Sequence, residues 1–216
     1  MINKYKKYLK KITTYLNKYF EQQKPYIFCK EGCSICCETG HYPISDLEFK
    51  YLNTGYQSLN KKNKLIVKEN IKKTKENYKD KSYYRCPFLI EKKCSIYKYR
   101  PLVCRSYGLL QFFENEKKKV SYYIPCCATE GLNYSTVYDE KTLSISGEKF
   151  KTLNIETEPL SYNVSYKYLL KNELNSDIEF GEVNNLIERF WLIILKKSRL
   201  TTRQSAPFMF YLCSIT

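Results

Sequence analysis

Residues 29–37 read CKEGCSICC and place four cysteines in one short stretch, with the last two adjacent. This group constrains the local fold strongly, because thiols so close together are cross-linked, chemically reactive or bound to metal. We therefore consider a disulfide framework, a redox or nucleophilic cysteine, and a metal or iron–sulfur site. The chain has ten cysteines in all: Cys29, Cys33, Cys36, Cys37, Cys86, Cys94, Cys104, Cys126, Cys127 and Cys213.

The cellular compartment bears on this choice, because disulfides persist mainly outside the cytoplasm. The first residues, MINKYKKYLKKITTYLNKYFEQQK, lack the uninterrupted apolar region and the small-residue cleavage site of a signal peptide. The longest apolar block, FWLIIL at 190–195, is far shorter than the ~20 residues needed to span a membrane. We expect a cytoplasmic protein with no membrane partner, in which clustered cysteines hold metal more often than they form disulfides.

The geometry of the first cysteine group indicates a loop. On a straight helix Cys29 and Cys36 would lie about 10 Å apart along the axis, whereas thiolates that share one zinc ion lie only about 4 Å apart. Gly32 permits a loop that wraps around a site. A cluster with several iron atoms relaxes the limit, because each iron takes its own thiolate.

Two further uses of this spacing have less support. C-x3-C-x2-C is the spacing of the radical S-adenosylmethionine motif, but that class needs repeated βα units that the sequence does not predict. Ile35 also replaces the aromatic residue expected before the last cysteine. Cys33 and Cys36 form a C-x-x-C pair, which lacks the βαβ setting of a thioredoxin-like redox motif. Metal or cluster binding is therefore the favoured interpretation.

The net charge of +15 raises the question of a nucleic-acid partner. Only six of the 37 basic residues are arginine, the side chain that makes bidentate contacts with bases. The abundance of Lys, Tyr, Asn and Ile is typical of an AT-rich genome. We favour a solvated lysine surface over a nucleic-acid-binding surface.

Periodicity and capping signals predict several elements. Apolar residues recur at helical spacing over 3–23, 59–78 and 182–197. Ser45 and Glu48 form a capping box that opens a short helix, which we expect to end at Gly55. Strands are predicted in a hairpin over 86–97 and at 109–113 and 119–124, and Pro101 begins a helical turn that carries Cys104.

No repeat, linker or clear boundary interrupts the chain, so we predict a single domain over 1–216. Its fold class is α+β and mostly helical, with small β-hairpins and cysteine-bearing loops around a metal or iron–sulfur site. Residues 25–130 form the cysteine-cluster core, 1–24 an N-terminal helix, and 131–216 a mainly helical C-terminal part.

A second motif lies downstream of the first, in CPFLIEKKCSIYKYRPLVCRSY at 86–107. Together with CKEGCSICC it resembles the YkgJ-type CxxCxxCC cysteine-cluster family, described as a zinc- or iron-chelating domain. The family's second signature is similar to C-P-F-L followed by C-x-I-Y-x-x-R-P-x-x-C-R. The resemblance covers about residues 29–107 and extends toward 127. The first spacer differs, since three residues rather than two follow Cys29.

The resemblance implies roles for particular residues. The metal ligands expected first are Cys33, Cys36, Cys86, Cys94 and Cys104, followed by Cys29, Cys37, Cys126 and Cys127. Arg100 and Arg105 are expected to lie beside the ligands and offset the negative charge of the thiolates. The predicted cofactor is an iron–sulfur cluster, with [4Fe–4S] preferred, or Zn²⁺.

The sequence does not declare a reaction. It contains no phosphate-binding glycine loop, and one histidine without a predicted partner gives no Ser-His-Asp set. We predict a metal-binding protein. One alternative is a cluster-dependent modifying enzyme similar to flagellin lysine N-methylase, which would use S-adenosylmethionine and a protein substrate such as flagellin. The other is a basic zinc module that binds nucleic acid.

Overall fold

The computed structural model describes residues 1–29, 32–77, 83–114, 117, 120–142, 144–155, 159–161 and 178–195. Within these residues the chain forms two compact units, each built from two separate segments. Unit 1 comprises Met1–Glu31 and Arg105–Phe180, and unit 2 comprises Gly32–Cys104 together with the segment that starts at Gly181. None of the described helices is both long and apolar enough to cross a membrane.

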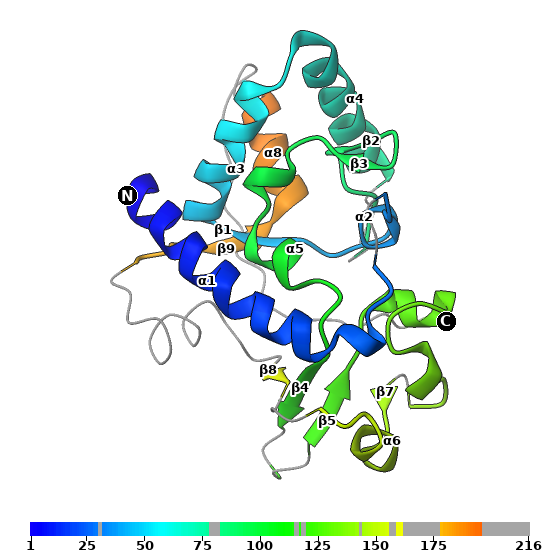
Figure 1. Ribbon diagram of the computed structural model, residues 1–216. Helices are drawn as coiled ribbons and strands as arrows, with labels where there is room; N and C mark the ends of the chain where they lie inside the picture. Colours follow the sequence, from blue (N-terminus) through cyan, green and yellow to red (C-terminus); the bar gives the residue numbers. More distant parts are fainter. Residues whose placement is uncertain are drawn as a thin grey trace. The chain divides into compact units, whose positions relative to one another are not determined.

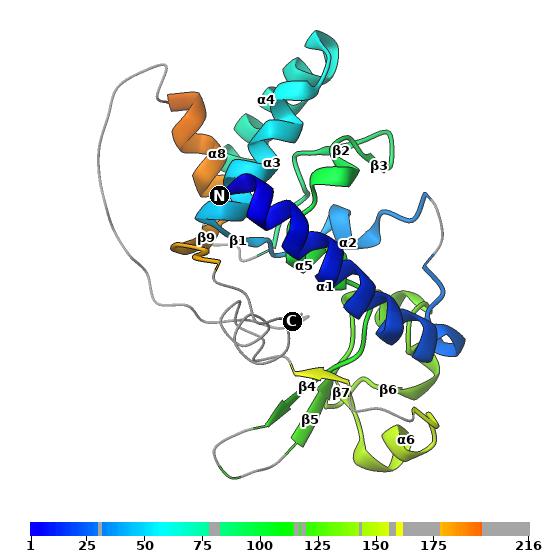
Figure 2. The same cartoon turned by 60° about the vertical axis from the view of Figure 1, so that its left-hand side comes forward.

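Unit 1 combines a long amphipathic helix with a small sheet (Figures 1 and 2). Helix α1 (Ile2–Gln22) buries its apolar face, as its spacing predicts: Tyr5, Tyr8, Leu9, Ile12 and Leu16. A 3-10 turn, η1 (Lys24–Tyr26), begins with Pro25 in its first turn and ends the helical stretch. The predicted N-terminal helix is therefore confirmed.

The sheet of unit 1 has the strand order β6-β7-β5-β4-β8. Strands β4 (Gln111–Glu114) and β5 (Val120–Tyr123) form the predicted antiparallel pair. Their neighbours are β6 (Tyr138–Asp139), β7 (Ser144–Ile145) and β8 (Leu160–Ser161), of which β8 runs parallel to β4. Short helical segments accompany the sheet: η3 (Cys126–Glu130), η4 (Ser135–Val137) and α6 (Gly147–Lys151).

One buried side chain ties the end of α1 to this sheet. Gln23 is fully buried, and its Oε1 accepts hydrogen bonds from the Leu110 N–H at 2.8 Å and from the Tyr134 hydroxyl. Tyr134 and Leu110 belong to the apolar core of the unit, with Val137, Ile145 and Leu153. A buried amide oxygen is costly without hydrogen-bond donors. These bonds therefore fix the position of Gln23, in the segment that leads to Cys29.

Unit 2 packs three helices and two short strand pairs around one core. Helices α3 (Asp46–Ser58), α4 (Lys61–Asn77) and α8 (Leu186–Leu195) lie together in both views (Figures 1 and 2). Strand β1 (Pro43–Ser45) pairs antiparallel with β9 (Val183–Asn185), and β2 (Leu89–Ile90) with β3 (Lys93–Cys94). The short helical elements are α2 (Ile35–Glu38), η2 (Tyr97–Tyr99) and α5 (Leu102–Ser106), whose last residues belong to unit 1.

The capping box at the start of α3 is confirmed, and its Glu48 side chain also binds the first residue of α5. The Ser45 Oγ accepts from the Glu48 N–H, and the Glu48 carboxylate accepts from the Ser45 N–H. Its Oε1 also accepts from the Leu102 N–H at 2.8 Å. A carboxylate that is only 1% exposed therefore caps two helices, α3 and α5, and so helps to place Cys104 on α5.

The predicted end of this helix at Gly55 is wrong. Helix α3 continues to Ser58, and Gly55 lies buried within it. A Cβ atom at Gly55 would lie only 2.5–2.7 Å from atoms of the Tyr99 side chain. The glycine therefore serves close packing of η2 against α3 and does not stop the helix.

Gly55→Ala is expected to destabilise the protein by about 1–3 kcal/mol, because the added methyl group overlaps the Tyr99 ring. Urea unfolding followed by circular dichroism measures the effect. Gly147→Ala is the matched control, since nothing lies within 4 Å of the added Cβ there. Equal stability of the two variants would contradict the packing role of Gly55.

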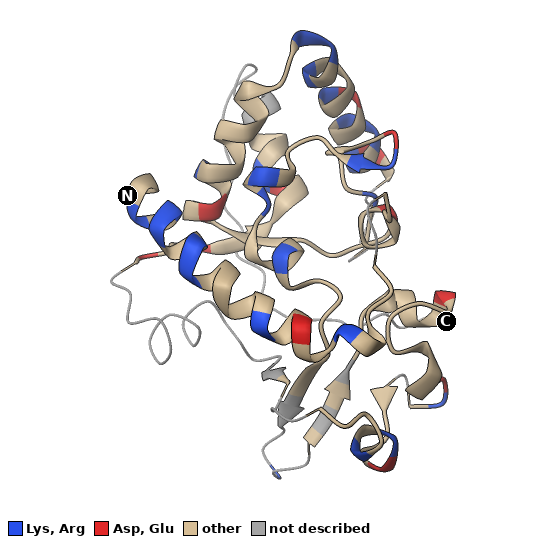
Figure 3. Ribbon diagram, in the orientation of Figure 1, with Lys and Arg blue, Asp and Glu red and all other residues tan. Residues whose placement is uncertain are grey.

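The predicted fold class, a mostly helical α+β protein, is confirmed. Basic residues occur at intervals along α1 and α4 (Figure 3), and those of α1 are exposed. Helix α4 also carries Glu69 and Glu76 among its lysines.

Candidate metal centre

Four thiols of unit 2 converge although they come from separate elements. Cys37 lies on α2, Cys86 precedes β2, Cys94 ends β3 and Cys104 lies on α5. Burial raises the pKa of Cys86 well above its usual value, and the thiols of Cys104, Cys37 and Cys94 raise it further. Burial likewise raises the pKa of Cys104, with added effects of Cys37 and Cys94. We call these four residues the thiol group.

Main-chain hydrogen bonds hold the first two members together. The Cys86 N–H donates to the Cys37 carbonyl at 2.8 Å, and the Cys37 N–H donates to the Ser34 carbonyl at 2.7 Å. An isolated bridge between Gly40 and Tyr84 continues the pairing of the two segments. The first cysteine motif and CPFL are thus joined through the backbone, about fifty residues apart in sequence.

The other two members are placed by a hairpin and a helical turn. In the hairpin Leu89 pairs with Cys94, and Glu91 and Lys92 at its tip have φ angles of 48° and 59°. Two positive φ angles in a two-residue turn match the twist of the paired strands. The Cys104 N–H donates to the Pro101 carbonyl at 3.1 Å, at the start of the predicted turn.

The thiol group lies at the edge of the apolar core of unit 2. Cys86 is 7% exposed and belongs to that core, and the other three members pack against it. Burial favours the neutral thiol, as the raised pKa of Cys94 also shows. A bound metal reverses this preference, because a coordinated thiol loses its proton.

Arg100 supplies positive charge to this group. Its charge opposes the effect of burial and lowers the pKa of Cys94 and Cys104. The guanidinium lies 3.5 Å from the centre of the Tyr97 ring, and its Nε donates to the Tyr97 carbonyl at 3.1 Å. The ring and the carbonyl therefore orient the Arg100 cation, whose charge acts on the thiols.

The adjacent cysteines of the first motif have different surroundings. A hydrogen bond from the Cys36 thiol lowers the pKa of Cys37, with smaller effects of Arg100 and Arg85 in the same direction. Cys36 is half-buried, and its carbonyl accepts from the Tyr42 hydroxyl at 2.8 Å. Cys33 is exposed in the loop before α2.

Unit 1 holds a second set of sulfur atoms. The Cys127 thiol donates a hydrogen bond to Cys29 and lowers its pKa to about 6, against the opposing effect of burial. The Asn133 Nδ2 donates to the Cys29 Sγ at 3.2 Å. Cys126 is disulfide-bonded, and its Sγ lies 3.8 Å from the Tyr107 hydroxyl. Arg105 begins the second segment of this unit, and Cys213 lies outside the described residues.

The donor set fits a metal, although the side chains are not in coordinating positions. Among the described residues, no three His, Cys, Asp or Glu side chains are placed to hold one metal ion. The thiol group nevertheless offers four sulfur ligands, the set found in structural zinc sites and in [4Fe–4S] clusters. Its chemistry therefore suits zinc or iron, while the positions of the sulfurs would change on binding.

Sequence reasoning ranked the ligands differently. It placed Cys33 and Cys36 ahead of Cys37, whereas the structure brings Cys37 next to Cys86, Cys94 and Cys104. The adjacency of Cys36 and Cys37 already indicated that only one of them faces the site, because the side chains of neighbouring residues point in different directions. Sequence reasoning did not identify Glu48 as a support for α5.

Four thiols from α2, the β2–β3 hairpin with its preceding residues and α5 therefore gather at the edge of the core of unit 2. Residues 28–128 match the family CxxCxxCC, described as "Putative zinc- or iron-chelating domain". This match confirms the predicted resemblance to that family over these residues. The chelation of zinc or iron in the family's description agrees with the predicted cofactor, an iron–sulfur cluster or Zn²⁺. No curated protein and no solved structure matches the chain, so similarity to flagellin lysine N-methylase is not shown.

Proposed function

We propose that the chain is a metal protein whose centre is a [4Fe–4S] cluster held by Cys37, Cys86, Cys94 and Cys104. The observation that carries the proposal is the packing of these four cysteines at the edge of one core, where the Cys86 N–H also donates to the Cys37 carbonyl. Such a cluster supplies electron transfer when it is bound. The protein's own residues supply the thiolates, a largely apolar surrounding and the charge of Arg100.

Zinc is the alternative occupant of the same four thiols. The described residues of unit 2 contain six cysteines, because Cys33 and Cys36 accompany the thiol group. The thiol group itself suits either occupant, because a zinc site and a [4Fe–4S] cluster each take four cysteine ligands. Both occupants leave a net charge near −2 with four thiolates, which Arg100 partly offsets.

The decisive measurement is the metal content of protein purified without air. A [4Fe–4S] cluster predicts about four iron and four sulfide per chain with broad visible absorption. Colourless protein with stoichiometric zinc would show that zinc occupies the four thiols in place of a cluster. The proposed chelating function would then stand with zinc as its metal. Chains that contain neither metal, even after reconstitution with iron and sulfide or with zinc, would contradict the proposal.

A cytoplasmic location suits this function, because the thiols must stay reduced to bind metal. The described residues include eight free cysteines, whereas Cys126 is disulfide-bonded. Methyl transfer to a protein such as flagellin stays a prediction, which labelled S-adenosylmethionine and purified flagellin would test. Nucleic-acid binding is tested separately by the salt dependence of binding to DNA.

Arg100→Gln is expected to weaken metal binding by about 10–100-fold, the usual effect of removing a residue that supports metal ligands. The physical reason is the loss of the positive charge that favours the thiolate forms of Cys94 and Cys104. Competition with a chromophoric chelator measures the affinity. Lys98→Gln removes the same charge from an exposed position two residues away and should change the affinity little.

A further inference from the structure

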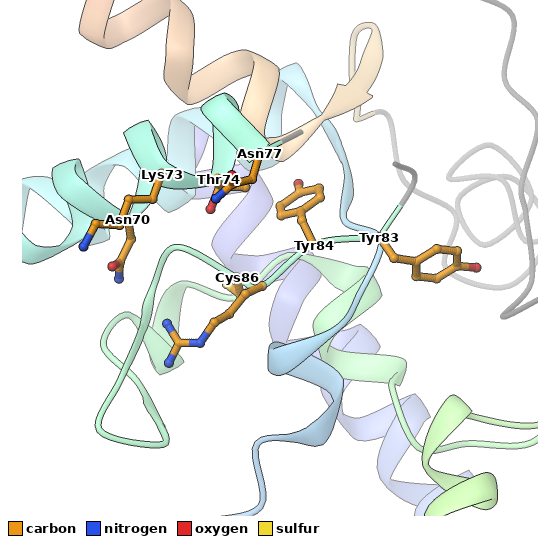
Figure 4. Close-up of a pocket in the computed structure, with 8 residues that line it drawn as sticks. Asn70, Lys73, Thr74, Asn77, Tyr83, Tyr84 and Cys86 are labelled. Atoms are coloured by element: carbon orange, nitrogen blue, oxygen red, sulfur yellow. The ribbon is translucent and has the colours of Figure 1, made fainter. Parts of the chain in front are cut away.

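A cavity of about 310 Å³ lies in unit 2 beside the thiol group. One wall is helix α4, and the other is the segment from Tyr83 to Cys86 (Figure 4). In Figure 4, Lys73 and Asn77 project from α4, whereas the ring of Tyr83 extends away from it. The volume is at the lower end of the range for small-molecule sites, which is about 300–1,000 Å³.

The charged side chains that line this cavity, Lys73 and Arg85, are both cationic. Asn70, Thr74 and Asn77 add amide and hydroxyl groups to the same wall. The Asn70 Nδ2 donates to the Pro87 carbonyl at 3.0 Å, which fixes the orientation of that amide. A lining of two cations and neutral hydrogen-bonding groups is complementary to an anion.

Acidic neighbours of the two cations are held only weakly. The Arg85 Nε donates to the Glu38 Oε2 at 2.7 Å, but both side chains are more than 40% exposed. The Lys73 Nζ lies 3.9 Å from the Glu69 Oε1, and this pair is exposed still further. Exposed ion pairs contribute about 0–1 kcal/mol, so a ligand anion can replace either carboxylate.

The cavity also borders the candidate metal centre, because Cys86 lines it and belongs to the thiol group. We propose that this cavity is a binding site for a small molecule with a phosphate or carboxylate group, which Lys73 and Arg85 hold. The proposal goes beyond metal binding and does not depend on which metal the thiols hold.

Isothermal titration calorimetry of the full metal-loaded chain tests this site, with inorganic phosphate and malonate as the two probes. Saturable one-site binding of at least one probe is expected at an ionic strength of about 0.15 M. The probe that binds more tightly distinguishes a phosphate ligand from a carboxylate ligand. Failure of both probes to bind saturably would overturn the proposal without affecting the metal content.

Charge-removing variants locate the site. Lys73→Gln and Arg85→Gln should each weaken binding by about tenfold or more, because each removes a charged hydrogen-bond donor. Lys68→Gln is the matched control, since Lys68 is exposed on the same helix and does not line the cavity. An equal loss in Lys68→Gln would show attraction by the overall positive charge and would overturn the proposal. Circular dichroism verifies that each variant folds.

Discussion

Cys86→Ser is expected to remove most of the bound metal, with a loss of affinity of at least about 100-fold. Residues that merely support ligands already account for about 10–100-fold, and Cys86 is the most buried member of the thiol group. A hydroxyl group of similar size does not replace a thiolate as a ligand for zinc or iron in such sites. Metal analysis of the purified variant measures the effect.

A loss of metal could also follow from damage to the apolar core, since Cys86 belongs to it. Val67→Ala is the matched control, because Val67 is fully buried in the same core on α4 and bears no thiol. This variant should lose stability and keep its metal. Full metal content in Cys86→Ser would contradict the assignment of the thiol group. Cys33→Ser, measured in parallel, shows whether the exposed thiol joins the ligands.

Removal of the metal is expected to lower the Tm of the protein by at least about 10 °C. Structural zinc contributes about 10–16 kcal/mol in small metal-dependent folds, and 1 kcal/mol shifts the Tm of a domain of about 100 residues by about 4–8 °C. The cause is local, because the metal would join α2, the β2–β3 hairpin and α5 of unit 2. Calorimetry before and after chelation measures the shift.

Hydrogen exchange shows where the stability is lost. Amide protection should fall first around Cys37, Cys94 and Cys104, whereas α1 and the β4–β5 pair of unit 1 should keep more of theirs. A chelator that is already saturated with metal is the control, because it shows any effect of the chelator on the protein other than metal removal. An unchanged Tm in protein shown to be free of metal would contradict a structural role for the centre.

Local signals in the sequence predicted local structure well. Residues at helical spacing predicted α1, and the Ser45–Glu48 box predicted the start of α3. The end of α3 could not be read in the same way, because Gly55 is explained by the Tyr99 side chain from a distant segment. Similarly, the predicted helix over 182–197 begins only at Leu186. Val183–Asn185 pair instead with Pro43–Ser45 as strands β9 and β1.

The candidate site was predictable as a set of residues but not as an arrangement. The two motifs indicated that cysteines from 29–37 and 86–104 act together, and the Cys37–Cys86 backbone hydrogen bond joins these segments. Spacing alone could not show which of Cys36 and Cys37 faces the thiol group. That choice depends on the orientation of α2, which long-range pairing such as the Gly40–Tyr84 bridge sets.

The order of segments in unit 2 has a consequence for biosynthesis. The cysteines of the thiol group are translated well before β9 and α8, yet Leu186, Ile187 and Phe190 belong to the same core as Cys86. At about 5–20 residues per second, several seconds separate the appearance of Cys104 from that of α8. During this interval the nascent thiols lack part of their apolar cover, so they are open to oxidants and to adventitious metals. Completion of the centre is therefore expected to follow the emergence of α8 from the ribosome.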